Sequence, residues 1–160
     1  CKKVNPVMHM DHKVGDKLFI DYAGKTLEIV DEKTGEIIEV QFFVAILGAS
    51  QYTYAEASMS QKKEDFITSV ENALHYFKGV PKAIVPDNLK SAVTKSSKYE
   101  PTVNETFLDF SEHYGTTILP ARAYKPRDKS LAEGAVKILY QRIYAKLGNR
   151  TFYSLSLIHI

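Results

Sequence analysis

The chain has 160 residues, which is enough for one domain with a substantial core rather than for two. Hydrophobic residues make up 44% and charged residues 25% of it, and no apolar run approaches the roughly 20 residues that a membrane span needs. Fibrous, disordered and membrane-spanning classes are therefore excluded. Because Cys1 is the only cysteine, a disulfide framework and a cysteine-based zinc site are excluded as well.

The first half of the chain predicts an antiparallel meander. Its β-branched and aromatic runs predict four strands, at Lys17–Tyr22, Thr26–Val30, Ile37–Leu47 and Tyr52–Ala57. Asp31–Gly35 has the composition of a hairpin turn, with Gly35 suited to a positive φ.

The second half alternates helices and strands. Apolar residues recur at helical spacing over Lys62–Phe77, where Ser60 is a candidate N-cap and Gly79 and Pro81 are expected to stop the helix. Ala83–Pro86 is a short buried strand of the kind that a crossover helix places parallel to its neighbour. A helix over Asn104–Tyr114 ended by Gly115, a strand over Thr116–Leu119 and an amphipathic helix over Leu131–Leu147 follow. This order predicts a mixed sheet with helices on its faces.

Both ends of the sequence differ from this pattern. Residues 1–15 show no period and predict a linker, and residues 154–160 predict an irregular tail, such as a sequence-assembly scar. We therefore expect the folded core at 16–153, within a piece of a longer protein.

Charge is distributed unevenly along the chain. The net charge is +2, yet between Ala121 and Arg150 eight basic residues stand against two acids. A local basic stripe on a nearly neutral chain indicates a polyanionic partner, whereas the alternative is a solvated helix face.

Three acids fall at positions where chemistry is common. Asp21 lies inside an apolar strand, Asp87 directly follows the strand Ala83–Pro86, and Glu133 lies one turn into the last predicted helix. Taken singly, each has an ordinary interpretation as a turn residue, a helix cap or a first-turn acid that the helix dipole stabilises. Taken together, clustered carboxylates are the ligands that Mg²⁺ prefers, and two such ions promote phosphoryl displacement.

The segments that carry these acids resemble a known family. They are LFIDYAG at 18–24, VPDNLK at 85–90 and PRDKSLAEG at 126–134. In this order they resemble the integrase core of bacterial insertion-sequence transposases, and within these the IstA type, over about Val14 to Tyr153. More residues separate Asp87 from Glu133 than separate the corresponding acids in retroviral integrases, but this segment varies in length among insertion-sequence enzymes.

The resemblance implies an RNase H-like mixed five-stranded sheet flanked by helices, with Asp21, Asp87 and Glu133 as the catalytic DDE triad. It implies two Mg²⁺ or Mn²⁺ ions at this triad. It also implies cleavage of transposon ends by water, followed by attack of the freed 3′-OH on target DNA.

Partners are implied in the same way. They are double-stranded DNA, further copies of the chain assembled on DNA, and an AAA+ ATPase helper. The resemblance also implies an upstream DNA-binding region before residues 1–15, and a cytoplasmic, nucleoid-associated location in a bacterium.

Further residues are candidates for contacts with DNA. Lys125, Arg127 and Lys129 precede the helix of Glu133, and Lys137 lies one turn after Glu133, where a surface pair between the two is the alternative. Asn88 and Lys90 adjoin Asp87 and could orient DNA or a metal-bound water.

Other polar and aromatic residues have more ordinary interpretations. His9, Asp11 and His12 are expected to belong to a solvated linker, His113 to end a helix, and Tyr22 to lie in the core. The ten tyrosines are scattered along the sequence and predict no stacking platform.

Two alternatives to a transposase stay open. One is a nuclease of the RNase H or junction-resolvase kind, which would cleave without joining strands. The other is a catalytically silent or truncated domain that binds DNA or a partner.

Overall fold

The computed structural model describes residues 13–24, 26–31, 34–86, 93–95, 102–120, 134, 136–138 and 141. Its strands are β1 (Lys17–Tyr22), β2 (Leu27–Val30), β3 (Ile37–Leu47), β4 (Thr53–Ser58), β5 (Ala83–Pro86), β6 (Val93–Lys95), β7 (Thr102–Val103) and β8 (Thr117–Ile118). Its named helices are α1 (Lys63–Phe77) and α2 (Glu105–Tyr114). None of the helices in these ranges is long and apolar enough to cross a bilayer.

The predicted mixed sheet is confirmed, and it has six strands. Five of them follow the order β4-β3-β1-β5-β8, with β3 antiparallel to β4 and β1, and with β5 parallel to β1 and β8. The sixth, β2, pairs with Ile37–Val40 of β3, whereas β1 pairs with Phe43–Leu47. The long β3 therefore pairs with both β1 and β2. The sheet has the six strands that the residue pattern indicated, one more than the five that the resemblance implied.

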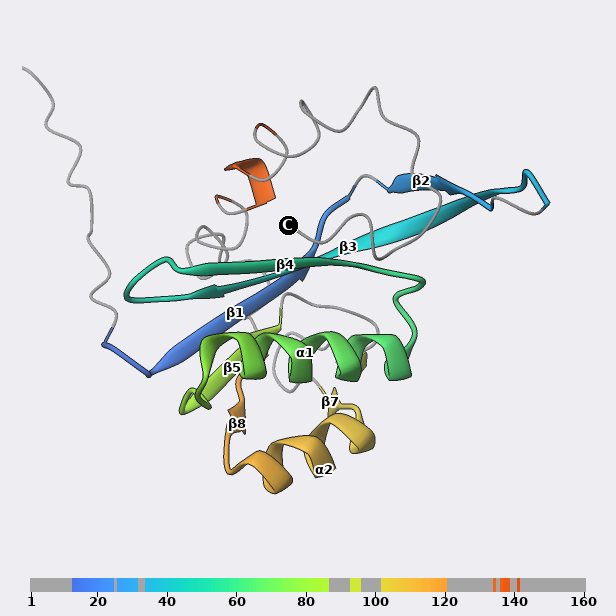
Figure 1. Ribbon diagram of the computed structural model, residues 1–160. Helices are drawn as coiled ribbons and strands as arrows, with labels where there is room; N and C mark the ends of the chain where they lie inside the picture. The colour runs from blue at the N-terminus through green and yellow to red at the C-terminus, as the bar shows by residue number, and fades with distance from the viewer. Residues whose placement is uncertain are drawn as a thin grey trace, which may run out of the picture.

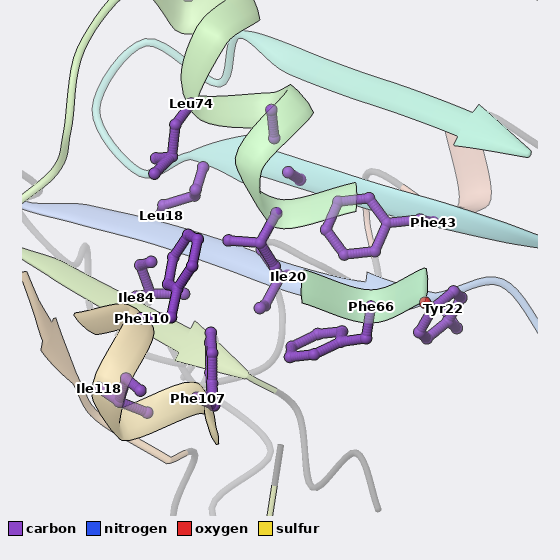
Figure 2. Close-up of a cluster of buried hydrophobic side chains, with 13 residues drawn as sticks. Leu18, Ile20, Tyr22, Phe43, Phe66, Leu74, Ile84, Phe107, Phe110 and Ile118 are labelled. Carbon is purple, nitrogen blue, oxygen red and sulfur yellow. The ribbon is translucent and has the colours of Figure 1, made fainter. Parts of the chain in front are cut away.

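One face of the sheet packs against both named helices, which lie below it in Figure 1. Strand alternation turns Leu18, Ile20 and Tyr22 toward this face, and they join Phe43 and Ala45 of β3 in one buried cluster. Phe66 of α1 lies edge-on to Phe43 of β3 and to Phe107 of α2, so the three elements share one core (Figure 2).

The opposite face is also buried. Residues that alternate along β1 and β3 with those of the helix-covered face point to this second face. Among them, Phe19 is 5%, Phe42 1% and Val44 1% exposed. The helical residues 136–138 lie on this side of the sheet in Figure 1. Asp21 shares this face by alternation, so it lies across the sheet from α1.

The ends of the two helices partly correct the prediction. The N-cap of α1 is Lys62 and makes no side-chain capping bond, while Ser60 lies two residues earlier and accepts from the Lys62 N–H at 3.1 Å. The last helical residue is Phe77, as predicted, but the left-handed residue that ends the helix is Lys78, with φ 54°, rather than Gly79. For α2 the prediction is confirmed, because the Asn104 side chain accepts from Thr106 N–H and Gly115 ends the helix at φ 66°.

Two short strands were missed, and three were predicted with shifted bounds. The β6–β7 pair is a separate two-stranded sheet, with strands too short to show a period in the sequence. Strands β2, β4 and β8 each start one residue later than predicted. Of the helix predicted over Leu131–Leu147, residues 134 and 136–138 are described as α-helix, and most of the rest lies outside the described residues.

Candidate functional site

The carboxyl ends of β1 and β5 lie next to each other. The two strands are parallel, and their register pairs Leu18 with Ile84 and Ile20 with Pro86. Asp21 follows Ile20 in β1, and Asp87 follows Pro86 in the sequence. Open α/β sheets bind ligands outside the carboxyl ends of their strands, so this edge is the candidate site.

The Asp21 carboxylate is half-buried and directed by a backbone contact. Its Oδ1 accepts a hydrogen bond from the Tyr22 N–H at 2.8 Å. The next residue, Ala23, donates its N–H to the Phe42 carbonyl of β3 at 2.8 Å. Because successive N–H groups of a strand point to opposite edges, the Tyr22 N–H points away from β3, toward the side of β5. The Asp21 carboxylate therefore lies on the side of β1 that faces β5.

Most of the other predicted site residues fall outside the described residues. These are Asp87, Asn88, Lys90, Lys125, Arg127, Lys129 and Glu133, together with His9, Asp11 and His12. Lys137 is described and is exposed on its helical stretch. The described residues thus place one acid of the predicted triad and the strand end that leads to the second.

Tyr22 lies in the core, as predicted, on the opposite face from Asp21. Its ring is 7% exposed and meets Phe43 edge-on, with ring centroids 5.6 Å apart (Figure 2). Burial raises the pKa of the Tyr22 hydroxyl to about 12, an effect that nearby Asp65 and Glu56 add to and that Ser58 and Ser69 oppose. Within the described ranges this hydroxyl has no hydrogen-bond partner.

A buried carboxylate in β4 was missed. Glu56 is 7% exposed and accepts from Tyr54 Oη at 2.5 Å and from Asn72 Nδ2 of α1 at 3.1 Å. The signal was present in Tyr54-Ala55-Glu56-Ala57-Ser58, because alternation puts Glu56 on the same face as Tyr54 and Ser58. This carboxylate joins β4 to α1 on the face opposite Asp21, so it belongs to the core rather than to the candidate site.

The tyrosines are less scattered than their sequence positions implied. Tyr52 stacks on Tyr76 with centroids 5.3 Å apart, and their hydroxyls hydrogen-bond at 2.8 Å. Tyr54 and Phe77 complete the cluster. Since Tyr52 precedes β4, which runs parallel to β1, the stacked pair of Tyr52 and Tyr76 lies toward the amino end of β1, away from Asp21.

The chemistry of Asp21 fits a hard cation. A carboxylate oxygen is the ligand type that Mg²⁺ selects, and this one lies at the edge where the parallel strands end. The described residues contain no group of three His, Cys, Asp or Glu side chains that could hold a metal ion. Two of the three predicted ligands, Asp87 and Glu133, lie beyond those residues.

Comparison with known proteins finds transposases. No protein-family model matches the chain. A protein of Sinorhizobium fredii named as a transposase is 52% identical over 145 residues, which cover 91% of this chain and 28% of that protein. The transposase of insertion sequence IS21 from Pseudomonas aeruginosa is 30% identical over 119 residues, 74% of this chain and 30% of that protein. The chain thus spans less than a third of the length of these relatives.

Solved structures with the same fold are retroviral integrases. The catalytic core domain of BIV integrase aligns with a TM-score of 0.60 at 14% identity, covering 90% of this chain and 80% of that one. The HTLV-2 integrase catalytic core domain in complex with magnesium aligns with a TM-score of 0.55 at 13% identity, covering 90% and 79%. These likenesses establish the integrase-core, RNase H-like fold.

Proposed function

Since the chain belongs to the insertion-sequence transposases and has an integrase-core fold, we propose that it is the catalytic core of a DDE transposase, with the core at residues 16–153. In this role it cuts transposon ends and joins them to target DNA. The observation that carries the proposal is the parallel register of Ile20 with Pro86, together with the Asp21 carboxylate on the β5 side of β1. Asp21 and Asp87 therefore directly follow two residues, Ile20 and Pro86, that are paired in the sheet.

In the proposed site, each of the two ions would be held by two of the three acids. Asp21 and Asp87 would hold one divalent ion jointly, and Asp21 and Glu133 the second. Asp21 is suited to the shared position because its N-terminal neighbours are buried in the central strand of the sheet, which limits movement of its backbone. When bound, the ions would stabilise charge on the attacking and leaving oxygens of the phosphate.

The HTLV-2 integrase core, a protein with this fold, is known in complex with magnesium, which supports Mg²⁺ or Mn²⁺ as the cofactor. Carboxylate ligands also favour these hard ions over softer metals. We therefore propose two ions, with no role for the single cysteine.

Double-stranded DNA is the proposed substrate. Phosphate groups attract clustered lysine and arginine, and the basic stripe between Ala121 and Arg150 adjoins the predicted helix of Glu133. Lys125, Arg127 and Lys129 would contact the backbone beside the scissile bond, with Lys137, Asn88 and Lys90 around them. We also propose assembly of several copies on paired DNA ends and dependence on an AAA+ ATPase helper.

The test is metal titration with a labelled DNA duplex. Wild type and the Asp87→Asn variant would be titrated with Mg²⁺ and Mn²⁺, and nicking and strand joining would be followed on gels. Asp109→Asn is the matched control, because Asp109 is an exposed acid on α2, in the layer across the sheet from Asp21. Isotope-labelled ends of several sequences would be compared, since the end sequence is unknown.

The outcomes separate the candidate functions. Metal-dependent nicking and joining that Asp87→Asn abolishes and Asp109→Asn retains would support the proposal. Nicking without joining would favour an RNase H-like nuclease. If neither wild type nor control binds Mn²⁺ or cleaves DNA, the triad is wrong, and a DNA- or partner-binding domain replaces it.

A further inference from the structure

Tyr22, the last residue of β1, contacts both the hydrophobic core and the Asp21 side chain. On the α1 face its ring is buried and packs edge-on against Phe43 of the neighbouring strand. Through its backbone the same residue donates an N–H to the Asp21 carboxylate at 2.8 Å. Packing on one face of the sheet is thereby linked to the placement of a carboxylate on the other.

The contact lies just beyond the pairing between β1 and β5 that the structure describes. Among the described residues, the last paired positions between these strands are Ile20 and Pro86. Tyr22 lies two residues beyond Ile20, and its N–H points to the β5 side, where the Asp21 carboxylate serves as its acceptor. On the other edge, Ala23 N–H is held by the Phe42 carbonyl of β3. On the β3 edge, the end of β1 is thus held by backbone pairing. On the β5 edge, the Tyr22 N–H is held by the Asp21 side chain.

The ring, rather than the hydroxyl, anchors Tyr22. In the part of the chain that the structure describes, the hydroxyl makes no hydrogen bond of regular geometry, although Ser58 and Ser69 lie close enough to lower its pKa. A buried hydroxyl without a well-formed hydrogen bond adds little to the stability of the fold. The ring is held by apolar and aromatic contacts, which a phenylalanine would make equally well.

We propose that Tyr22 is a positioning residue for Asp21. Its buried ring fixes the end of β1, and its N–H holds the Asp21 carboxylate on the side of β5, where the second acid follows in the sequence. The inference rests on the proposed function only for the consequence of this placement, which is metal binding. The placement itself can be tested without any metal.

Two substitutions at Asp21 separate placement from metal binding. Asp21→Asn keeps an oxygen that accepts from the Tyr22 N–H but loses the charge, whereas Asp21→Ala removes the acceptor. In metal-free buffer, hydrogen exchange of the Tyr22 amide should be protected in wild type and in Asp21→Asn. In Asp21→Ala it should speed up by roughly tenfold, as expected for one lost hydrogen bond. Equal Tyr22 protection in wild type and in Asp21→Ala would overturn the inference.

Substitutions at Tyr22 test the role of the ring. Tyr22→Phe should leave the Mn²⁺ dissociation constant, the kcat and the KM for DNA unchanged. Tyr22→Leu should weaken Mn²⁺ binding roughly tenfold and lower kcat with little change in KM, as loss of a support behind a metal ligand does. Phe110→Leu is the matched control, because Phe110 is 8% exposed in the same core but lies on α2.

All variants would be compared at a temperature at which circular dichroism shows them fully folded. If Tyr22→Leu and Phe110→Leu change Mn²⁺ affinity and Tyr22 amide exchange equally, Tyr22 has only a structural role and the inference fails. If wild type binds no Mn²⁺, the proposed function fails. The exchange results for Asp21→Asn and Asp21→Ala then still decide the placement of Asp21.

Discussion

Ile20 and Pro86 lie opposite each other on the parallel strands β1 and β5, and an acid follows each of them in the sequence. The first acid, Asp21, has its carboxylate turned toward β5 by the Tyr22 N–H. This relationship brings together two segments 66 positions apart and places the carboxyl ends of the two strands side by side.

Two residues share a left-handed backbone and should respond to substitution in opposite ways. Lys78 has φ 54° at the end of α1, and Gly115 has φ 66° at the end of α2. Since a Cβ in this conformation costs about 1 kcal/mol, Lys78→Gly should raise the free energy of unfolding by about 0.5–1 kcal/mol. Gly115→Ala should lower it by a similar amount, because a Cβ there meets no atom within 4 Å and only the backbone term remains.

Urea unfolding would measure both substitutions, with Gly79→Ala as the control. Gly79 lacks a positive φ and has free space for a Cβ, so its substitution should change stability little. A destabilising Lys78→Gly would show that contacts of the lysine side chain outweigh its backbone strain.

The contrast at these helix ends shows what the sequence predicts well. Asn104 and Gly115 were assigned to the ends of α2 correctly because each acts through its own local chemistry. For α1, the last helical residue, Phe77, was also predicted correctly, but the residue that turns the chain is Lys78, one residue before the predicted Gly79. Where several local signals compete, tertiary packing of the helix chooses among them.

Long strands were predicted well, and relationships between distant segments were not. Ile37–Leu47 was placed with both bounds correct, since seven of its eleven residues are β-branched or aromatic and leave no competing pattern. The stacking of Tyr52 on Tyr76 was missed, because it depends on where α1 crosses β4. The register of Ile20 with Pro86 likewise follows from pairing in the sheet, so the residue pattern alone did not give it, and the adjacency of the two acids was expected only from the family resemblance.

Phe66 should be among the residues on which stability depends most. It is fully buried on α1 and lies edge-on to Phe107, with ring centroids 4.9 Å apart. Phe66→Ala should lower the free energy of unfolding by about 3–5 kcal/mol, through lost burial and the cavity left behind. Leu108→Ala, at a residue 42% exposed on α2, is the control and should cost well under half as much. Urea midpoints at constant slope would measure both, and similar losses would contradict the packing.

Stability should fall at alkaline pH, in part through Tyr54. Burial, followed by the hydrogen bond to Glu56, raises the pKa of Tyr54 above its ordinary value of 10.0. Above this pH the unfolded chain releases the Tyr54 proton while the folded chain keeps it, so the folded state binds more protons. The contribution of Tyr54 is therefore complete below pH 10.0 and is lost as pH rises toward the higher folded pKa.

Tyr54→Phe should accordingly flatten the fall of unfolding free energy above pH 10.0. The comparison uses slopes against pH, because the substitution also removes one donor to the buried Glu56 and lowers stability at neutral pH. Tyr52→Phe is the control at an exposed tyrosine of the same cluster. If Tyr54→Phe and wild type lose stability in parallel up to pH 12, the tyrosine does not keep its proton in the fold.

The salt dependence of DNA binding tests which surface meets DNA. Each phosphate contact adds about 0.9 to the slope of log binding constant against log salt concentration. Changing Lys125, Arg127 and Lys129 together to alanine should therefore reduce that slope by about 2–3.

The control triple is Lys13, Lys78 and Lys82, which are exposed and belong to the amino end of β1, the end of α1 and the amino end of β5. Both triples remove three positive charges, so a purely non-specific attraction would reduce the slope equally. A reduction confined to the first triple would support contact between DNA and residues 125–129, whereas a reduction confined to the control would place DNA near the amino ends of β1 and β5.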